Sequence, residues 1–216
     1  MTIEDFCETR GVSRILHFTT NRGCIGVLHS RALRSRQRLT EDEQLKFVFQ
    51  PNAASRTKDA AWLDYVNLSI ERINNTFFGI CSERWHDGRD NWWCVLQFSP
   101  EILTHPGVFF STTNNIYTSV VRGEGVAGIA ALYGDKVQRW YGNVVARPGD
   151  LPDAYTTCVQ AEVLYPGEVS TSWLEAIHVR TSEESDEVAA QIRATGHRDV
   201  PVYVNGEIFG ENVDEC

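Results

Sequence analysis

A glutamine and a glutamate lie two residues apart in the segment Gln160-Ala161-Glu162, after the Pro- and Gly-containing loop at 147–153. We expect residues 157–165 to form a strand, in which side chains two apart point to the same face. On that face the amide of Gln160 could select an acceptor by hydrogen bonding, while the carboxylate of Glu162 handles charge and a proton. The polar face of an exposed edge strand has the same pattern, so the pattern alone leaves both interpretations open.

Two further groups of side chains could bind a ligand. His17 lies among apolar residues, which is typical of a core histidine as well as of a ligand-binding one. Four arginines occur within eight residues: Arg31, Arg34, Arg36 and Arg38. Such a run could form a basic groove for phosphate groups, but a solvated basic surface has the same composition.

The composition indicates a globular protein. The chain has 216 residues, 42% of them hydrophobic and 23% charged, and we expect one domain over residues 1–216. Its six cysteines form no C-x-x-C pair, so we expect no zinc site, no other metal and no disulfide framework. The start of the chain lacks a signal pattern and no apolar run is long enough to cross a bilayer, which predicts a cytoplasmic protein with no membrane contact.

The net charge of −9 argues against strong nonspecific binding to duplex DNA, which requires many lysine and arginine contacts with phosphates. Single-stranded nucleic acid remains compatible with this charge, because bases can stack on aromatic side chains. Four tryptophans are candidates for stacking: Trp62, Trp85, Trp92 and Trp140. Each of them could equally be a core residue.

Segments of the two regular types alternate along the chain, which predicts an α+β fold. Strands are expected at residues 14–18, 65–70, 92–98, 108–111, 157–165, 174–179 and 200–204. Helices are expected within residues 20–33, 125–133 and 183–194.

Taken in order, four segments resemble the DarT family of nucleic-acid ADP-ribosyltransferase toxins. The segments are Ile15 to Asn21 with its I-L-H-F-T start, Arg56 to Phe78 with an L-S-I strand, Trp93 to Asn115, and Gln160 to Val179. The resemblance covers about residues 14 to 180. The sequence departs from it at Ile73, where proline is expected before Asn74, and after Val179, where no part of the chain matches.

The resemblance implies the ADP-ribosyltransferase fold, with two packed, mostly antiparallel sheets around an NAD-binding cleft and flanking helices. The co-substrate NAD⁺ would be held by five residues: His17, Thr19, Asn21, Ser69 and Asn74. Glu162 and Arg56 would be catalytic. The substrate would be bound by four others: Gln160, Arg34, Arg36 and Arg38.

The implied reaction is transfer of one ADP-ribose from NAD⁺ to a base in single-stranded DNA, by a toxin whose partner is an antitoxin that removes ADP-ribose or blocks the cleft. Glu162 would bind the ribose 2′-hydroxyl, stabilise the positive charge that develops on the sugar, and take a proton from the attacking base. The base must lie outside a duplex to reach such a site. Guanine is the favoured acceptor, because the L-S-I strand and Gln160 resemble the guanine-modifying branch.

Other interpretations remain open. The acceptor could be RNA, thymine in DNA, or an arginine side chain of a protein, which Gln160 would orient. A protein of another class, a catalytically inactive module that binds nucleic acid or an antitoxin, would retain the same fold.

Overall fold

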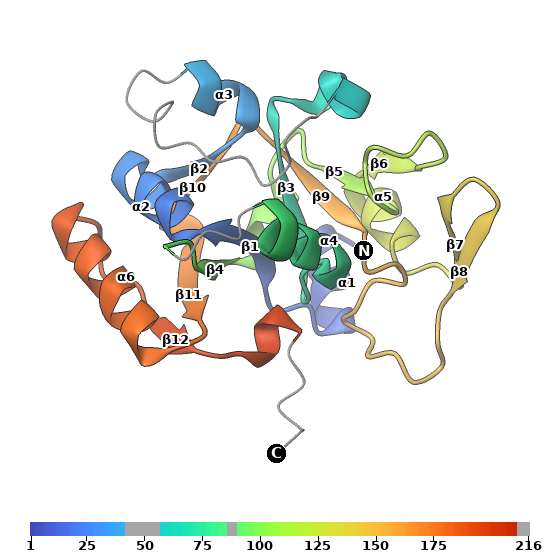
Figure 1. Cartoon of the computed structure of the whole chain (residues 1–216). Helices are drawn as coiled ribbons and strands as arrows, with labels where there is room; N and C mark the ends of the chain where they lie inside the picture. The colour runs from blue at the N-terminus through green and yellow to red at the C-terminus, as the bar shows by residue number, and fades with distance from the viewer. Residues whose placement is uncertain (42–56, 86–89, 211–216) are drawn as a thin grey trace.

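The centre of the fold is an eight-stranded sheet with the order β12-β11-β4-β1-β3-β9-β5-β6 (Figure 1). This computed structural model describes residues 1–41, 57–85 and 90–210. The strands of the sheet are β1 (Ile15–Thr20), β3 (Tyr65–Ile70), β4 (Trp93–Phe98), β5 (Phe109–Ser111), β6 (Arg122–Glu124), β9 (Glu162–Pro166), β11 (Leu174–Val179) and β12 (Val202–Val204). β11 and β12 are parallel, and every other neighbouring pair in this sheet is antiparallel.

The sheet is split in its middle, between β1 and β3. These strands share only two residue pairs, Ile15 with Ile70 and Leu16 with Ser69, whereas β1 and β4 share six. The α+β class predicted from the sequence is confirmed. The two packed sheets expected from the resemblance are instead two halves of one sheet, because this short pairing joins them while letting them diverge.

Helices cover both faces of the sheet. The helices are α1 (Ile3–Arg10), α2 (Asn21–Ser30), α3 (Arg36–Glu41), α4 (Asn75–Ile80), α5 (Gly125–Ala131) and α6 (Ser182–Ala194). The larger core cluster joins residues of α1, α2, α5 and α6 to one set of alternating strand residues, including Ile15 and Phe98. The smaller cluster joins Leu16 and Phe18 to Phe78 of α4, which lies across the middle of the sheet in Figure 1.

Local signals in the sequence account for several element ends. Thr181 caps α6 by accepting a hydrogen bond from the Glu184 N–H, while the Glu184 carboxylate accepts from the Thr181 N–H. Pro100 begins a 3₁₀ turn, Pro100–Thr104, which the Ser99 side chain caps by accepting from the Glu101 N–H. No helix among the described residues is long and apolar enough to cross a membrane.

Two small sheets flank the main one. β2 (Ala32–Arg34) pairs with β10 (Glu168–Ser170), and β7 (Lys136–Trp140) pairs with β8 (Asn143–Ala146). The β7–β8 hairpin lies at the edge of the molecule, beside β6 and α5 (Figure 1). This hairpin was not predicted from the sequence. Its strands pair with each other and not with the main sheet.

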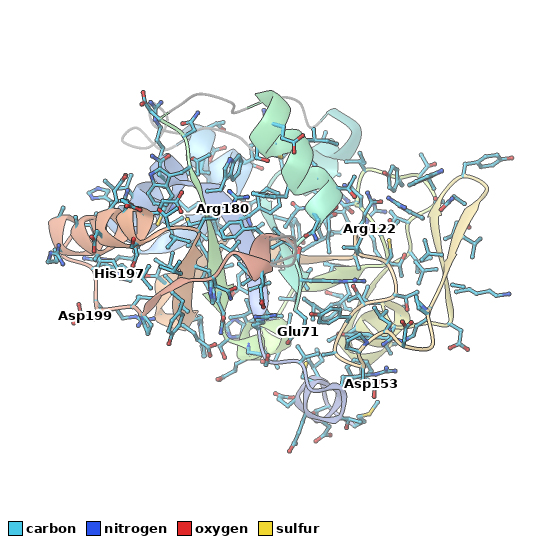
Figure 2. The ribbon with its side chains drawn as sticks, turned by 60° about the horizontal axis from the view of Figure 1, so that its bottom comes forward. Glu71, Arg122, Asp153, Arg180, His197 and Asp199 are labelled. Atoms are coloured by element: carbon cyan, nitrogen blue, oxygen red, sulfur yellow. The ribbon has the colours of Figure 1, made fainter. Side chains whose placement is uncertain are left out.

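Glu71, labelled in Figure 2, joins the residues before β1 to the end of β3, where the two halves of the sheet meet. Its side chain, only 5% exposed, accepts hydrogen bonds from the N–H of Ser13 and Arg14 and from the Ser13 hydroxyl. The Arg14 guanidinium lies 3.3 Å from the same carboxylate. Glu71 does this with a φ of 61°, a conformation that L-residues other than glycine seldom adopt. The start of β1 is therefore fixed to the end of β3 by one buried carboxylate.

We predict that Glu71→Gln lowers the free energy of unfolding by about 2–4 kcal/mol, because an amide NH₂ would face donors in a buried site. Urea denaturation followed by circular dichroism measures this change. Glu101→Gln is the matched control, since Glu101 is exposed, and it should alter stability by less than about 0.5 kcal/mol. Equal effects of the two substitutions would contradict the assigned role of Glu71.

Candidate active site

His17 lies where β1 and β3 separate. Its Nδ1 is 3.0 Å from the backbone carbonyl oxygen of Asn67 on β3, beyond the last residue pair between the two strands. The imidazole therefore bridges the divided strands in place of a backbone hydrogen bond. The two strands can therefore separate here while the side chain of His17 still connects them.

The hydrogen bond to Asn67 also sets the tautomer of His17. A carbonyl oxygen only accepts, so Nδ1 carries the proton and Nε2 is left as an acceptor in the neutral ring. Burial lowers the pKa of His17, which keeps the ring neutral near pH 7, although the bond to Asn67 acts in the opposite direction. His17 can therefore accept a hydrogen bond from a ligand hydroxyl through Nε2, as a contact with NAD⁺ requires.

The sheet register brings Ser69 and Glu162 together. Leu68 of β3 faces Val163 of β9, so the next position places Ser69 beside Glu162. Glu162 in turn faces Ser111 of β5. Residues opposite each other in antiparallel strands share a face, with Cβ atoms about 4.5–5.5 Å apart. The predicted Ser69 and Glu162 thus lie on one face of the sheet, next to the gap bridged by His17.

Glu162 is the first residue of β9 and is oriented by the loop between β5 and β6. Its Oε2 accepts a hydrogen bond of 2.7 Å from the backbone N–H of Asn115. Asn115 is 1% exposed, so the donor is fixed inside the protein. Each carboxylate oxygen can accept more than one hydrogen bond, so a bond from a backbone N–H is compatible with binding a ligand hydroxyl.

Gln160 does not lie on the strand with Glu162, and this prediction was wrong. The strand begins at Glu162, because the Ala161 N–H donates to the Cys158 carbonyl oxygen and closes a turn before it. The Oε1 atom of Gln160 accepts a 2.9 Å hydrogen bond from Nε of Arg139 on β7. Gln160 is 6% exposed, so its amide holds the hairpin against the turn.

Three other residues predicted to contact NAD⁺ lie at the ends of elements near the gap. Thr19 is 8% exposed, and its hydroxyl occupies the space that a Cβ on Gly23 would need, at 2.0 Å. Asn21 begins α2, and its Nδ2 donates to the Asp90 carbonyl oxygen. Asn74 caps α4 by accepting from the N–H of Phe77, so its side-chain oxygen already has a structural role.

Buried amide atoms of three asparagines have no hydrogen-bond partner among the described residues. These atoms are Oδ1 of Asn21, Oδ1 of Asn67 and Nδ2 of Asn115. Each residue adjoins the site: Asn21 follows β1, Asn67 lies two residues before Ser69, and Asn115 contacts Glu162. An unpaired buried polar atom costs about 1–3 kcal/mol, so these atoms fit a polar ligand with hydroxyl and amide groups.

The arginines predicted to form a basic groove do not lie beside Glu162. Nε of Arg34 lies 3.3 Å from Glu168, and Nε of Arg38 lies 3.1 Å from Asp64. These carboxylates lie near the end of β9 that is remote from Glu162, and they offset much of the local positive charge. Of the other two arginines predicted to act in the site, Arg36 is the first residue of α3, and Arg56 lies outside the described residues.

The tryptophans proposed for base stacking have different environments. Trp92 donates from Nε1 to Glu187, and the Trp62 ring packs against Tyr65 and Phe109. Trp140, on the hairpin, is 39% exposed. The side chain of Trp85 lies outside the described residues. Trp140 is therefore the most accessible of the three that the structure describes.

A family model described as DarT, ssDNA thymidine ADP-ribosyltransferase, matches residues 16–210. The chain belongs to the DarT family. Membership confirms the predicted enzyme class, an NAD-dependent ADP-ribosyltransferase. It also corrects the expectation that nothing after Val179 matches, because the family model extends to residue 210. No curated protein sequence matches the chain significantly.

Solved DarT structures share the fold. The chain is similar to Thermus sp. 2.9 DarT in complex with NAD⁺, with a TM-score of 0.64, 16% identity, and coverage of 90% of this chain and 96% of that one. The same Thermus protein in complex with ADP-ribosylated ssDNA has a TM-score of 0.63 and 13% identity, and the match covers 92% of this chain and 96% of that one. Thermosipho africanus DarTG in complex with ADP-ribose gives 0.54 and 12%, with 91% of this chain and 50% of that chain covered.

Two residues of this DarT site, Asn115 and Arg122, were not predicted from the sequence. Asn115 donates to Glu162, and Arg122 donates to Asn115. The local signal was an Asn- and Thr-rich loop at 112–115, which is also the composition of ordinary turns. The contact of Asn115 with Glu162, and that of Arg122 with Asn115, depend on pairing between β5, β6 and β9, which the sequence does not show.

We predict that the protein loses stability as the pH falls from about 6.5 towards 4. Burial lowers the pKa of His17, His178 and His197, and that of His178 falls to about 4. In the unfolded chain these rings titrate near 6.5, so between the two values the unfolded state binds more protons and gains stability as the pH falls. Thermal unfolding should show a lower Tm at pH 5 than at pH 7.5.

Replacing one of these histidines provides the control. His178→Gln removes a titrating ring while keeping a group that can hydrogen-bond with Gln97, so the fall in Tm between pH 7.5 and 5 should become smaller. A wild-type Tm that is constant over this range would contradict the prediction.

Proposed function

We propose that this chain is a toxin of the DarT family that transfers one ADP-ribose from NAD⁺ to thymidine in single-stranded DNA. The observation that carries the proposal is the row formed by Ser69 and Glu162 beside the His17 gap, in a chain whose family model is described as an ssDNA thymidine ADP-ribosyltransferase. The family match over residues 16–210 supports one catalytic domain.

The residues around the gap fit NAD⁺. Nε2 of His17 offers an acceptor for a ribose hydroxyl, and the unpaired amide oxygens of Asn21 and Asn67 offer further contacts. Thermus sp. 2.9 DarT, which shares this fold, is described in complex with NAD⁺. When bound, NAD⁺ supplies the ADP-ribose, and nicotinamide leaves with the electrons of its bond to the ribose.

Glu162 is the residue suited to the chemistry. Its carboxylate would bind the ribose 2′-hydroxyl and stabilise the positive charge that develops on the sugar as nicotinamide leaves. It would then accept the proton of the base nitrogen that forms the new bond to the ribose. In thymidine the one ring nitrogen that carries a proton is N3. A carboxylate that accepts a proton, such as that of Glu162, therefore suits thymidine as the group that receives ADP-ribose.

Thymidine replaces guanine as our first choice of acceptor. The preference for guanine rested on the L-S-I strand and on Gln160, and the second ground is lost because Gln160 lies in a turn, bonded to Arg139. The family description names thymidine, and a Thermus relative is described in complex with ADP-ribosylated ssDNA. Guanine remains a specific alternative outcome of the experiment below.

The β7–β8 hairpin offers a surface for a single strand near Glu162. Tyr141 at its tip is 94% exposed, and the Arg139 guanidinium lies 4.2 Å from the centre of the Trp140 ring. Exposed aromatic rings with an adjacent cation can stack bases without many phosphate contacts, which suits a protein with a net charge of −9. Arg139 links this surface to Gln160, two residues before Glu162.

An antitoxin is the proposed protein partner. The relative from Thermosipho africanus is described as DarTG in complex with ADP-ribose, and this chain matches 50% of that chain. A partner that removes ADP-ribose from the modified base, or that covers the candidate site at His17 and Glu162, would restrain the toxin.

Mass spectrometry of modified oligonucleotides tests the proposal. Single-stranded oligonucleotides that each contain one kind of base, as DNA and as RNA, are incubated with the protein and NAD⁺, alongside a cell lysate with labelled NAD⁺. We expect the mass of one ADP-ribose on thymidine-containing DNA alone. Glu162→Ala should reduce the rate at least about a hundredfold, the scale of a lost general base.

Other outcomes would reject parts of the proposal. Modification of guanine DNA alone would reject thymidine, and label on proteins alone would reject nucleic acid as the substrate. An unchanged rate in Glu162→Ala would remove Glu162 from the reaction. No transfer to any substrate by the wild-type chain would favour an inactive binding module.

A further inference from the structure

Glu162 lies at the N-terminal end of its strand, where the pairing between strands does not by itself fix the direction of its side chain. It is the first residue of β9, and the residues before it form a turn. The carboxylate is oriented by the 2.7 Å hydrogen bond from the Asn115 N–H. The direction of that N–H therefore contributes to where the carboxylate lies.

The loop that carries Asn115 is closed at its base. The Thr112 N–H donates to the Val121 carbonyl oxygen, and the Val121 N–H donates to the Thr112 hydroxyl. The Ser111 hydroxyl donates to the Thr113 carbonyl oxygen at 2.7 Å. These bonds fix both ends of the loop but do not reach Asn115 itself.

Arg122 is the residue that holds Asn115. Its Nε donates to Oδ1 of Asn115, and its Nη2 donates to the Asn115 backbone carbonyl oxygen at 2.7 Å. One planar guanidinium thus forms hydrogen bonds with both the side chain and the backbone of the same residue. The Arg122 guanidinium also lies 5.2 Å from the centre of the Trp62 ring, which packs against Phe109 of β5.

We propose that Arg122 is a positioning residue for Glu162, acting through Asn115. Arg122 begins β6 and is exposed, and Figure 2 shows it between α4 and the β7–β8 hairpin. By fixing both the side chain and the carbonyl of Asn115, it fixes the N–H that orients the Glu162 carboxylate. Misplacing a reacting group by about 1 Å can reduce a rate about a hundredfold. The inference rests on the proposed role of Glu162.

Steady-state kinetics of three variants test this role. Arg122→Ala should lower kcat for ADP-ribose transfer about 10- to 100-fold and change KM for NAD⁺ less than about threefold, because binding groups at His17 stay in place. Arg122→Lys keeps the charge but loses the two-point grip, so its kcat should be intermediate. Arg193→Ala, an exposed arginine on α6, is the matched control and should leave kcat unchanged.

A double-variant cycle separates positioning from a general structural effect. In the Glu162→Gln background, Arg122→Ala should cause no further loss of rate, because the group that it positions is absent. An equal loss in both backgrounds would overturn the proposal. So would an Arg122→Ala variant with unchanged kcat, or one whose lost activity accompanies a lower Tm. If wild-type protein shows no transfer, the proposed function fails instead, and Arg122→Ala should then displace the Glu162 carboxylate in a crystal structure.

Discussion

Two residue pairs hold β1 and β3 together, and the candidate site depends on the point at which this pairing ends. Ile15 faces Ile70 and Leu16 faces Ser69, after which the strands diverge. A sheet that splits would normally leave backbone groups unpaired, at a cost of about 1–3 kcal/mol each. Glu71 offsets this at one end by binding Ser13 and Arg14, and His17 offsets it at the other by binding the Asn67 carbonyl.

The same constraint gives the site its chemistry. Because His17 uses Nδ1 to bridge the strands, Nε2 must be an acceptor, and burial lowers the pKa so that it remains one. Because β9 continues the register of β3, Glu162 lies beside Ser69 on the face next to the gap. An acceptor for ribose and a carboxylate for the reacting carbon are thus placed by strand pairing, before any ligand binds.

Part of this could be predicted from the sequence. Period-two alternation and β-branched residues located β3 and β11 at the predicted residues. His17 and Glu162 were identified by resemblance to a family, and the family is confirmed. Their roles as NAD⁺ and catalytic contacts stay predictions.

The rest depends on contacts between distant segments. Residues 157–161 have the composition of a strand, yet the Ala161 to Cys158 hydrogen bond and the Arg139 side chain stabilise a turn instead. The arginines at 34 and 38 suggested a basic groove, but Glu168 and Asp64 neutralise them once β9 and β10 are in place. The grip of Arg122 on Asn115 likewise follows from tertiary pairing and has no local pattern.

The tautomer of His17 is the most direct test of the claim that strand separation builds the NAD⁺ site. Nuclear magnetic resonance of ¹⁵N-histidine-labelled protein, with the His17 signal assigned by its loss in His17→Gln, reports which ring nitrogen carries the proton. We predict a proton on Nδ1 in the free protein near pH 7, and a shift of the Nε2 signal on addition of NAD⁺ to the Glu162→Gln variant. A proton on Nε2, or an Nε2 signal unchanged by saturating NAD⁺, would contradict the account.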